Sequence, residues 1–236
     1  AAVPIIAFFL WLLLLRGKSW RDMRATLRWV GCALLLVVVY MFSWQLWQSY
    51  AEKAIGEPPA FHYGYSISVG FNTDSMGSYS DEEMYKLCAY YFDEGLTAPE
   101  AQERMLEAAK SHIGSGDINF PKLFSVKLHT LLGNDEGGAY YAKAVLSPIM
   151  YSMLAVLSNI FYYALMILAL AGSIRLFGSG EIGPILIAPM FVLGLTLAHM
   201  LVEVAGRYHY SVIPMLIILA ASSCGSSGTD SGPLSG

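Results

Sequence analysis

Hydrophobic residues gather in five long runs along the chain, and polar residues fill the stretches between them. A helix needs about 20 apolar residues to cross the roughly 30 Å hydrocarbon core of a bilayer. Three of the runs have about this length and hold no charged residue, while the first and the last are shorter. The pattern predicts an all-α integral membrane protein with about five transmembrane helices, at residues 1–15, 29–47, 145–171, 182–202 and 208–224.

The first run begins at Ala1 without an initiator Met and without a basic region before it. A secretory signal peptide carries such a basic region. We therefore interpret this run as the remainder of a membrane helix, and we expect the chain to be the C-terminal part of a longer protein.

Composition agrees with a membrane protein and excludes several other classes. Hydrophobic residues make up 56% of the chain and charged residues 14%, whereas soluble domains carry roughly 25% charged residues. Three cysteines without a CxxC or Cys/His spacing predict neither a disulfide framework nor a zinc site. The net charge of −4 offers no basic surface to nucleic acid, so we expect no nucleic-acid partner.

Charge asymmetry sets the expected orientation. The loop at residues 16–28 holds five Arg or Lys residues and one Asp, which favours the cytosolic side under the positive-inside rule. Residues 48–144 then lie outside, with 14 acidic and seven basic residues. We expect a multi-pass protein of the plasma (inner) membrane whose large loop is extracytoplasmic.

This orientation divides the chain into four parts. Residues 1–47 form two transmembrane helices joined by a basic cytosolic loop, and residues 48–144 form an extracytoplasmic helical loop domain. Residues 145–224 form three transmembrane helices. Residues 225–236 are rich in Ser and Gly and form a disordered cytosolic tail.

Helix-capping signals predict three short amphipathic helices in the outer region. They run from Ser80 to Gly95, from Thr97 to Gly114 and from Asn119 to Gly133. In the second helix, Ala101, Met105, Ala108 and His112 mark one face. Residues 57–79 contain several Pro and Gly residues and are predicted to be a loop.

Oxygen-bearing residues in the outer region form a candidate site for a divalent cation. Asn72, Thr73, Asp74 and Ser75 precede the acids at residues 81–83, and hard cations bind several oxygen ligands. The EF-hand spacing is absent, and the acids also fit the first turn of a helix, whose dipole they stabilise. Both interpretations stay open, and no other metal site is predicted.

Three segments carry a resemblance to a known family. Residues 62–76 read HYGYSISVGFNTDSM and continue GSYSDEEMYKL, residues 127–141 read KLHTLLGNDEGGAYY, and residues 203–219 read EVAGRYHYSVIPMLIIL. Together they resemble the later part of polytopic bacterial glycosyltransferases of the GT-C superfamily, in the branch of the protein O-mannosyltransferases and lipid A aminoarabinose transferases. The second segment departs from the family pattern W-x-D-G-[TA]-[YF]. Its residues 133–140 read GNDEGGAY, which lacks the first aromatic residue of that pattern and holds extra residues.

The resemblance implies a polyprenyl-phosphate sugar as donor, bound at the outer face of the membrane among the membrane lipids. The sugar would be transferred to a cell-envelope acceptor on that face. It places the catalytic carboxylate in an earlier outer loop, upstream of Ala1, so the catalytic residue is unknown and this chain would not complete the reaction alone. It also marks a candidate loop site, with Asp74 beside the matching residues: His62, Asn72, Asp74 and Glu82.

Arg207 carries the most specific chemistry of the last segment. It is the sole basic residue after Arg175, and it lies on the expected outer side, against the positive-inside preference. A guanidinium makes bidentate hydrogen bonds to phosphate, where negative charge develops during sugar transfer. We therefore predict a donor-phosphate site of Arg207, Glu203, Tyr208 and His209. The alternative is an interfacial anchor for the helix.

Two neighbours of Arg207 extend this hypothesis. Glu203 lies four residues earlier, so it is expected to pair with Arg207 if the helix continues. His199 lies one turn before Glu203 and is either a proton carrier or a hydrogen-bond donor between helices.

Two other functions stay open. A transporter or flippase subunit would move a lipid-linked saccharide without chemistry, and it predicts broken helices, for which Pro184, Pro189 and Pro214 are candidates. A membrane anchor predicts a dispensable Arg207 and an exposed apolar stripe on the outer helices. An acidic outer loop upstream of Ala1 would favour the enzyme.

Overall fold

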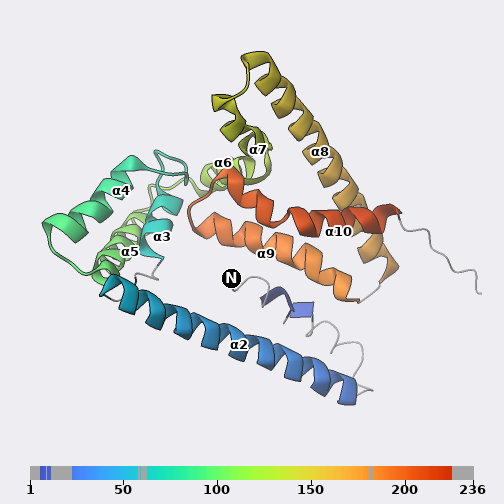
Figure 1. The fold of residues 1–236 in the computed structure, drawn as a ribbon, viewed down its shortest axis with the longest axis horizontal. Coiled ribbons are helices and arrows are strands. Elements are labelled where there is room, and N and C mark those ends of the chain that lie inside the picture. The colour runs from blue at the N-terminus through green and yellow to red at the C-terminus, as the bar shows by residue number, and fades with distance from the viewer. Residues whose placement is uncertain are drawn as a thin grey trace, which may run out of the picture.

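The computed structural model of the chain describes residues 6–8, 10–11, 23–57, 59, 63–180 and 183–224. Within these residues the fold is all-helical and contains no strand. Figure 1 shows helices of the predicted outer region, residues 48–144, on one side, and on the other the long helix α8 (Pro148–Ser179) crossing α10 (Ile213–Cys224), with α9 (Ile187–Leu201) beside α10. The helices of the predicted outer region include α3 (Gly64–Phe71), α4 (Asp81–Cys88), α5 (Ala98–Gly114) and α6 (Phe120–Leu132).

Helix α2 is the first long apolar helix and spans Met23–Ile55. It ends at Ile55, so the predicted end at residue 47 is wrong. Residues 48–55 include polar and charged residues, but their Ala, Glu and Lys favour helix and extend it beyond the apolar run. The helix stops before Gly56, whose φ of 84° is accessible to glycine at little cost.

Three helices in the described part of the chain are long and apolar enough to cross a membrane: Val30–Ile55 within α2, Pro148–Ser179 (α8) and Pro184–Leu201, which joins the 3₁₀ turn η3 (Pro184–Leu186) to α9 (Ile187–Leu201). The last predicted span appears as a shorter apolar helix, α10 (Ile213–Cys224), preceded by the 3₁₀ helix η4 (Gly206–Ser211). Of the first predicted span, residues 6–8 and 10–11 are helical and the rest lies outside the described residues. The count of five spans therefore stays a prediction.

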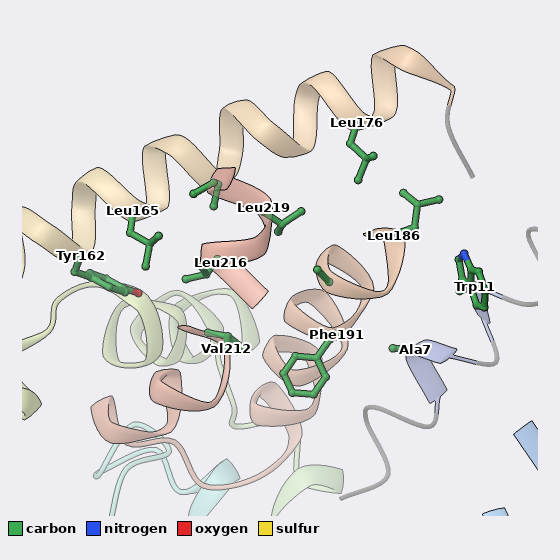
Figure 2. Close-up of a cluster of buried hydrophobic side chains, with 13 residues drawn as sticks. Ala7, Trp11, Tyr162, Leu165, Leu176, Leu186, Phe191, Val212, Leu216 and Leu219 are labelled. Atoms are coloured by element: carbon green, nitrogen blue, oxygen red, sulfur yellow. The ribbon is translucent and has the colours of Figure 1, made fainter. Parts of the chain in front are cut away.

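The largest apolar core among the described residues lies where α8, α9 and α10 meet. Figure 2 shows side chains of α8, α9 and α10 pointing into a shared cluster, with Ala7 and Trp11 of the N-terminal segment beside α9. Gly172 on α8 allows α8 and α10 to pack closely, because a Cβ atom there would overlap the carbonyl oxygen of Leu219 in α10. The two backbones therefore approach closely, as is typical of small residues between membrane helices.

The outer helices confirm the predicted capping signals. The structure has α4 at Asp81–Cys88, continued by the π-helical turn η1 at Ala89–Asp93, then α5 at Ala98–Gly114 and α6 at Phe120–Leu132. The backbone N–H of Glu83 donates to Ser80 Oγ (3.3 Å), and that of Lys122 donates to Asn119 Oδ1 (3.1 Å). The backbone N–H of Thr97 donates to the Glu100 carboxylate (2.8 Å), which is half of a capping box.

The predicted loop at residues 57–79 is wrong in its middle, where Gly64–Phe71 forms helix α3. The apolar residues there are buried against α5, and tertiary packing outweighs the poor helix propensity of the two glycines. Gly64 is required for this contact, since a Cβ atom would overlap the backbone carbonyl of Gln102. On α5 itself, Ala101 and Met105 are buried as predicted, but Ala109 is buried in place of Ala108.

Two short helices lead from the outer region into the membrane part. They are α7 (Glu136–Tyr140) and the 3₁₀ turn η2 (Tyr141–Ala144), and the next helix, α8, opens with Ser147 Oγ accepting the backbone N–H of Met150. At the other end of the outer region, Tyr91 Oη donates to Glu57 Oε1 (2.6 Å) just beyond α2. The outer helices are thus attached at both ends to membrane helices.

Candidate functional site

The chain breaks its helix after α9 and forms an extended link at residues 202–205 before η4 begins. This link lies along the outer region. The backbone N–H of Glu203 donates to the carbonyl oxygen of Ser66 (2.7 Å), and that of Val204 donates to the carbonyl oxygen of Gly77 (2.9 Å). The first and third segments that carry the family resemblance therefore lie side by side.

Gly70 explains how these two backbones come so close. A Cβ atom on Gly70 would lie 2.6 Å from the carbonyl carbon of Val202, which no side chain tolerates without movement. Both Gly70 and Val204 are buried, so the link forms part of the interior at this point.

Lys127 on α6 joins the same two backbones from a third direction. Its side chain is fully buried, and its ammonium donates to the carbonyl oxygens of Gly70 (2.9 Å), Met200 (2.9 Å) and Val202 (2.7 Å). Burial lowers the pKa of Lys127 to about 8. All three N–H groups of the ammonium are used, so Lys127 acts as a cap for the C-terminal end of α9.

The second and third segments meet at Asp135. Its carboxylate accepts hydrogen bonds from Tyr210 Oη (2.7 Å), from His209 Nε2 (3.1 Å) and from the hydroxyl of Ser158 on α8. Its backbone N–H donates to Asn159 Oδ1 (2.9 Å). Asp135 thereby connects the start of α7, helix α8 and η4.

His209 belongs to the interior of this cluster. The residue is 1% exposed, and its ring packs 4.9 Å from the ring of Tyr162 on α8. Because the Asp135 carboxylate is an acceptor, His209 Nε2 carries the proton, and Nδ1 has no hydrogen-bond partner among the described residues. His209 therefore stabilises η4 and does not present a nitrogen to an outside ligand.

Arg207 has the opposite placement, because its side chain is exposed beside the cluster. Its guanidinium carbon lies 5.4 Å from the ring centre of Tyr208, and that ring stacks on His199 of α9 at 4.9 Å. His199 Nδ1 also lies 3.1 Å from the carbonyl oxygen of Glu203, so it pairs within the protein. Arg207 is thus accessible to solvent, and the Tyr208 ring next to it is packed on His199.

The expected pairing of Glu203 with Arg207 is not formed. Helix α9 ends at Leu201, so the four-residue spacing no longer places the two side chains on one helical face. Among the described residues no ion pair joins them. The backbone N–H of Glu203 instead donates to the carbonyl oxygen of Ser66 in α3. Burial, with a smaller contribution from the Glu203 carboxylate, raises the pKa of Tyr65 to about 12.

The candidate loop site surrounds a cavity of about 250 Å³ in the outer region. Asn72, Asp74 and Glu82 line it together with Glu83, Lys86 and residues of α5, while His62 lies outside the described residues. Asn72 Oδ1 accepts the backbone N–H groups of Asp74 and Ser75 at 3.0 and 2.9 Å, which is a turn built by the side chain itself.

The acids of this cavity do not converge on a cation position. Lys86 Nζ lies 2.8 Å from Glu82 and 2.9 Å from Glu83, and Glu83 also accepts a hydrogen bond from Ser68. Burial raises the pKa of Glu83, but the hydrogen bonds from Ser68 and Lys86 outweigh it and lower the pKa. Across the described residues no group of three His, Cys, Asp or Glu side chains has metal-binding geometry, so the helix-turn interpretation of these acids fits better.

Comparison with protein-family models, curated proteins and solved structures finds no match to this chain.

Asp135 and Lys127 are not among the site residues predicted from the sequence. Lys127 stands four residues from both Leu123 and Leu131 on the buried face of α6, so a lysine on an apolar stripe was the available signal. Asp135 follows the helix stop at Gly133 and precedes a membrane helix, where an acid needs a partner.

Proposed function

We propose that this chain is part of a membrane glycosyltransferase that transfers a sugar from a polyprenyl-phosphate donor to a cell-envelope acceptor on the extracytoplasmic side. One observation carries the proposal. The three segments that resemble the GT-C superfamily lie far apart in the sequence, yet they meet at the link between α9 and η4.

The exposed guanidinium of Arg207 gives this meeting point its chemistry. It belongs to η4, which connects the apolar helices α9 and α10 along the chain, and the end of an apolar helix is where a lipid headgroup would meet the protein. A guanidinium binds phosphate oxygens by two parallel hydrogen bonds. As the bond between sugar and phosphate breaks, negative charge grows on the phosphate, so Arg207 stabilises the transition state more than the ground state.

The described residues supply binding of the donor phosphate, not the attack on the sugar. The resemblance assigns the catalytic carboxylate to an earlier outer loop. His209 and Asp135 are occupied with each other and with Tyr210, and they hold η4 in place. Tyr208 stacks between His199 and Arg207 and limits the rotation of the guanidinium.

Replacement of Arg207 tests the proposal. In membranes that contain the complete gene product, Arg207→Ala should lower sugar transfer from the polyprenyl-phosphate donor by at least about 100-fold, as loss of a preorganised charge partner does. Arg207→Lys keeps the charge but loses the planar fork, so an intermediate rate is expected. Arg175→Ala is the matched control, because Arg175 is also exposed but lies near the far end of α8 and bonds to Ser223. Unchanged transfer by a well-expressed Arg207→Ala variant would reduce Arg207 to an anchor.

The break between α9 and η4 also supports a second function, a flippase subunit for lipid-linked saccharides, because transporters use discontinuous helices at their binding sites. The two functions differ in their product. A flippase delivers the intact lipid-linked sugar to the other leaflet, whereas a transferase releases the free polyprenyl phosphate. Chromatography of the lipid fraction after incubation separates these products.

A further inference from the structure

We propose that Asp135 is a positioning residue for Arg207, and that it acts by fixing the short helix η4 against α7 and α8. The inference rests on the proposed function, in which Arg207 binds the phosphate of a polyisoprenyl lipid. It adds to that function a residue that never touches the lipid but sets how well the lipid is held.

The geometry around η4 supports this role. A six-residue 3₁₀ helix has little stability of its own, so its orientation depends on contacts with its neighbours. Two of its side chains, His209 and Tyr210, bond to the same carboxylate oxygen of Asp135. The other carboxylate oxygen accepts the hydroxyl of Ser158, which ties the whole assembly to the long helix α8.

Packing between α7 and η4 relates the position of Asp135 to that of Arg207. A Cβ atom on Gly137, two residues after Asp135, would lie 3.4 Å from Tyr210 Oη and 4.0 Å from the backbone nitrogen of Arg207. The start of α7 therefore packs directly on η4. On its other side η4 is fixed by Tyr208, which stacks on His199 of α9.

Loss of the Asp135 carboxylate removes the hydrogen-bonded support. Tyr210, His209 and Ser158 would each lose their acceptor at once, and the orientation of η4 would then depend on packing, such as that of His209 on Tyr162 and of Tyr208 on His199. Arg207 would keep its charge and its exposure but would no longer hold one orientation. Since misplacement of a binding group by about 1 Å is enough to weaken its effect strongly, affinity for the phosphate should fall.

A double-mutant cycle on phosphate binding tests the inference. The probe is farnesyl phosphate, titrated by calorimetry into the detergent-purified protein, with farnesol as the ligand that lacks the phosphate. We expect Asp135→Ala to raise the dissociation constant by about tenfold, less than Arg207→Ala does. Because Asp135 acts through Arg207, the double variant should bind no more weakly than Arg207→Ala alone. Asp117→Ala, at an exposed acid before α6, is the control and should bind as the unchanged protein does.

The outcomes separate this inference from the proposed function. If Arg207→Ala binds farnesyl phosphate as well as the unchanged protein does, the proposed function is wrong. If Arg207→Ala weakens binding but Asp135→Ala does not, or if the two losses add, Asp135 does not act through Arg207. Asp135→Asn keeps an oxygen acceptor for Tyr210 and should recover most of the affinity. If Asp135→Asn binds farnesyl phosphate as weakly as Asp135→Ala does, the negative charge of Asp135 matters and its positioning of η4 does not. This result also overturns the inference.

Instability of Asp135→Ala would not end the test. Tyr210→Phe removes only the 2.7 Å bond to the carboxylate and leaves the ring in place. We expect it to raise the dissociation constant by about threefold in the unchanged background and to add nothing to Arg207→Ala. Thermal unfolding midpoints for each variant show which of them are folded. A folded Tyr210→Phe variant with unchanged affinity would overturn the inference.

Discussion

The ammonium of Lys127 lies 2.7 Å from the carbonyl oxygen of Val202 and 2.9 Å from that of Gly70. One side chain of the outer helix α6 thus holds together the end of α3 and the extended link after α9. The last carbonyl groups of a helix have no partner within the helix, and a membrane protein must satisfy them elsewhere. Lys127 does so from within the protein, which makes the outer region and the membrane helix α9 one connected unit.

Lys127→Met should therefore destabilise the protein. Met has a similar stem but no donor, so the buried bonds to Gly70 and Met200 and the partly buried bond to Val202 are lost, at a cost of about 1–3 kcal/mol for each buried group left unsatisfied. Lys122→Met, at an exposed lysine of the same helix, should change little. The thermal unfolding midpoint in detergent measures both. Equal midpoints for the two variants would contradict the role of Lys127 as a cap.

The pH dependence of stability gives a separate test of the same buried lysine. The pKa of Lys127 is about 8 in the folded protein and about 10.5 when unperturbed. Between these values the unfolded chain binds more protons than the folded one, so the Lys127 contribution to stability should rise with pH across that window. The measurement is the difference in unfolding midpoint between the unchanged protein and Lys127→Met at pH 7 and at pH 10. A difference independent of pH would mean that the pKa of Lys127 is not lowered.

Local signals in the sequence predicted the outer helices well, but they could not predict how these helices meet. Ser80, Thr97 and Asn119 act within one turn of the backbone, so their capping role is visible in the sequence. Helix α3 could not be predicted from the sequence, because its stability comes from packing on α5 and its two glycines favour a loop. The same glycines are what permits that packing.

Gly70→Ala should separate α3 from the link at residues 202–205. The added Cβ atom would lie 2.6 Å from the Val202 backbone, so one of the two must move, and overpacking of this kind costs about 1–3 kcal/mol. Gly114→Ala is the matched control, because it has open space around it at the end of α5. A lower unfolding midpoint for Gly70→Ala alone is the expected result. If both variants unfold alike, the close backbone contact is absent.

Glu83 should make the outer region sensitive to acid. Hydrogen bonds from Ser68 and Lys86 hold the pKa of its carboxyl below the usual range despite burial. A group with a lowered folded pKa stabilises the protein above its unfolded pKa, and this stability is lost as pH falls through the folded pKa. Glu83→Gln should remove part of the stability at pH 7 and reduce its fall toward pH 3. Glu82→Gln, at an exposed acid on the same helix, should leave the acid profile nearly unchanged.

The different roles of the candidate-site residues could not be predicted from their spacing in the sequence. The residues Arg207, Glu203, Tyr208 and His209 are neighbours in sequence, but the structure gives them different roles. The helix break after Leu201 brings the Glu203 backbone against α3, and the bond to Asp135 holds His209 in the interior. Both effects depend on partners more than 70 positions away or on the end of a helix, which helical spacing alone does not reveal. Arg207 alone keeps the exposed position that its chemistry requires.

Cysteine labelling tests the orientation on which the proposed function depends. After replacement of the native cysteines, Lys110→Cys places one thiol on the exposed face of α5, and Gly178→Cys places one near the far end of α8. The basic residues at 16–28 favour the cytosol, so helices α3 to α6 should face the cell exterior. A membrane-impermeant maleimide should then label Lys110→Cys in intact cells and Gly178→Cys only after permeabilisation. The reverse pattern would put Arg207 on the cytosolic face, where an extracytoplasmic sugar transfer is impossible.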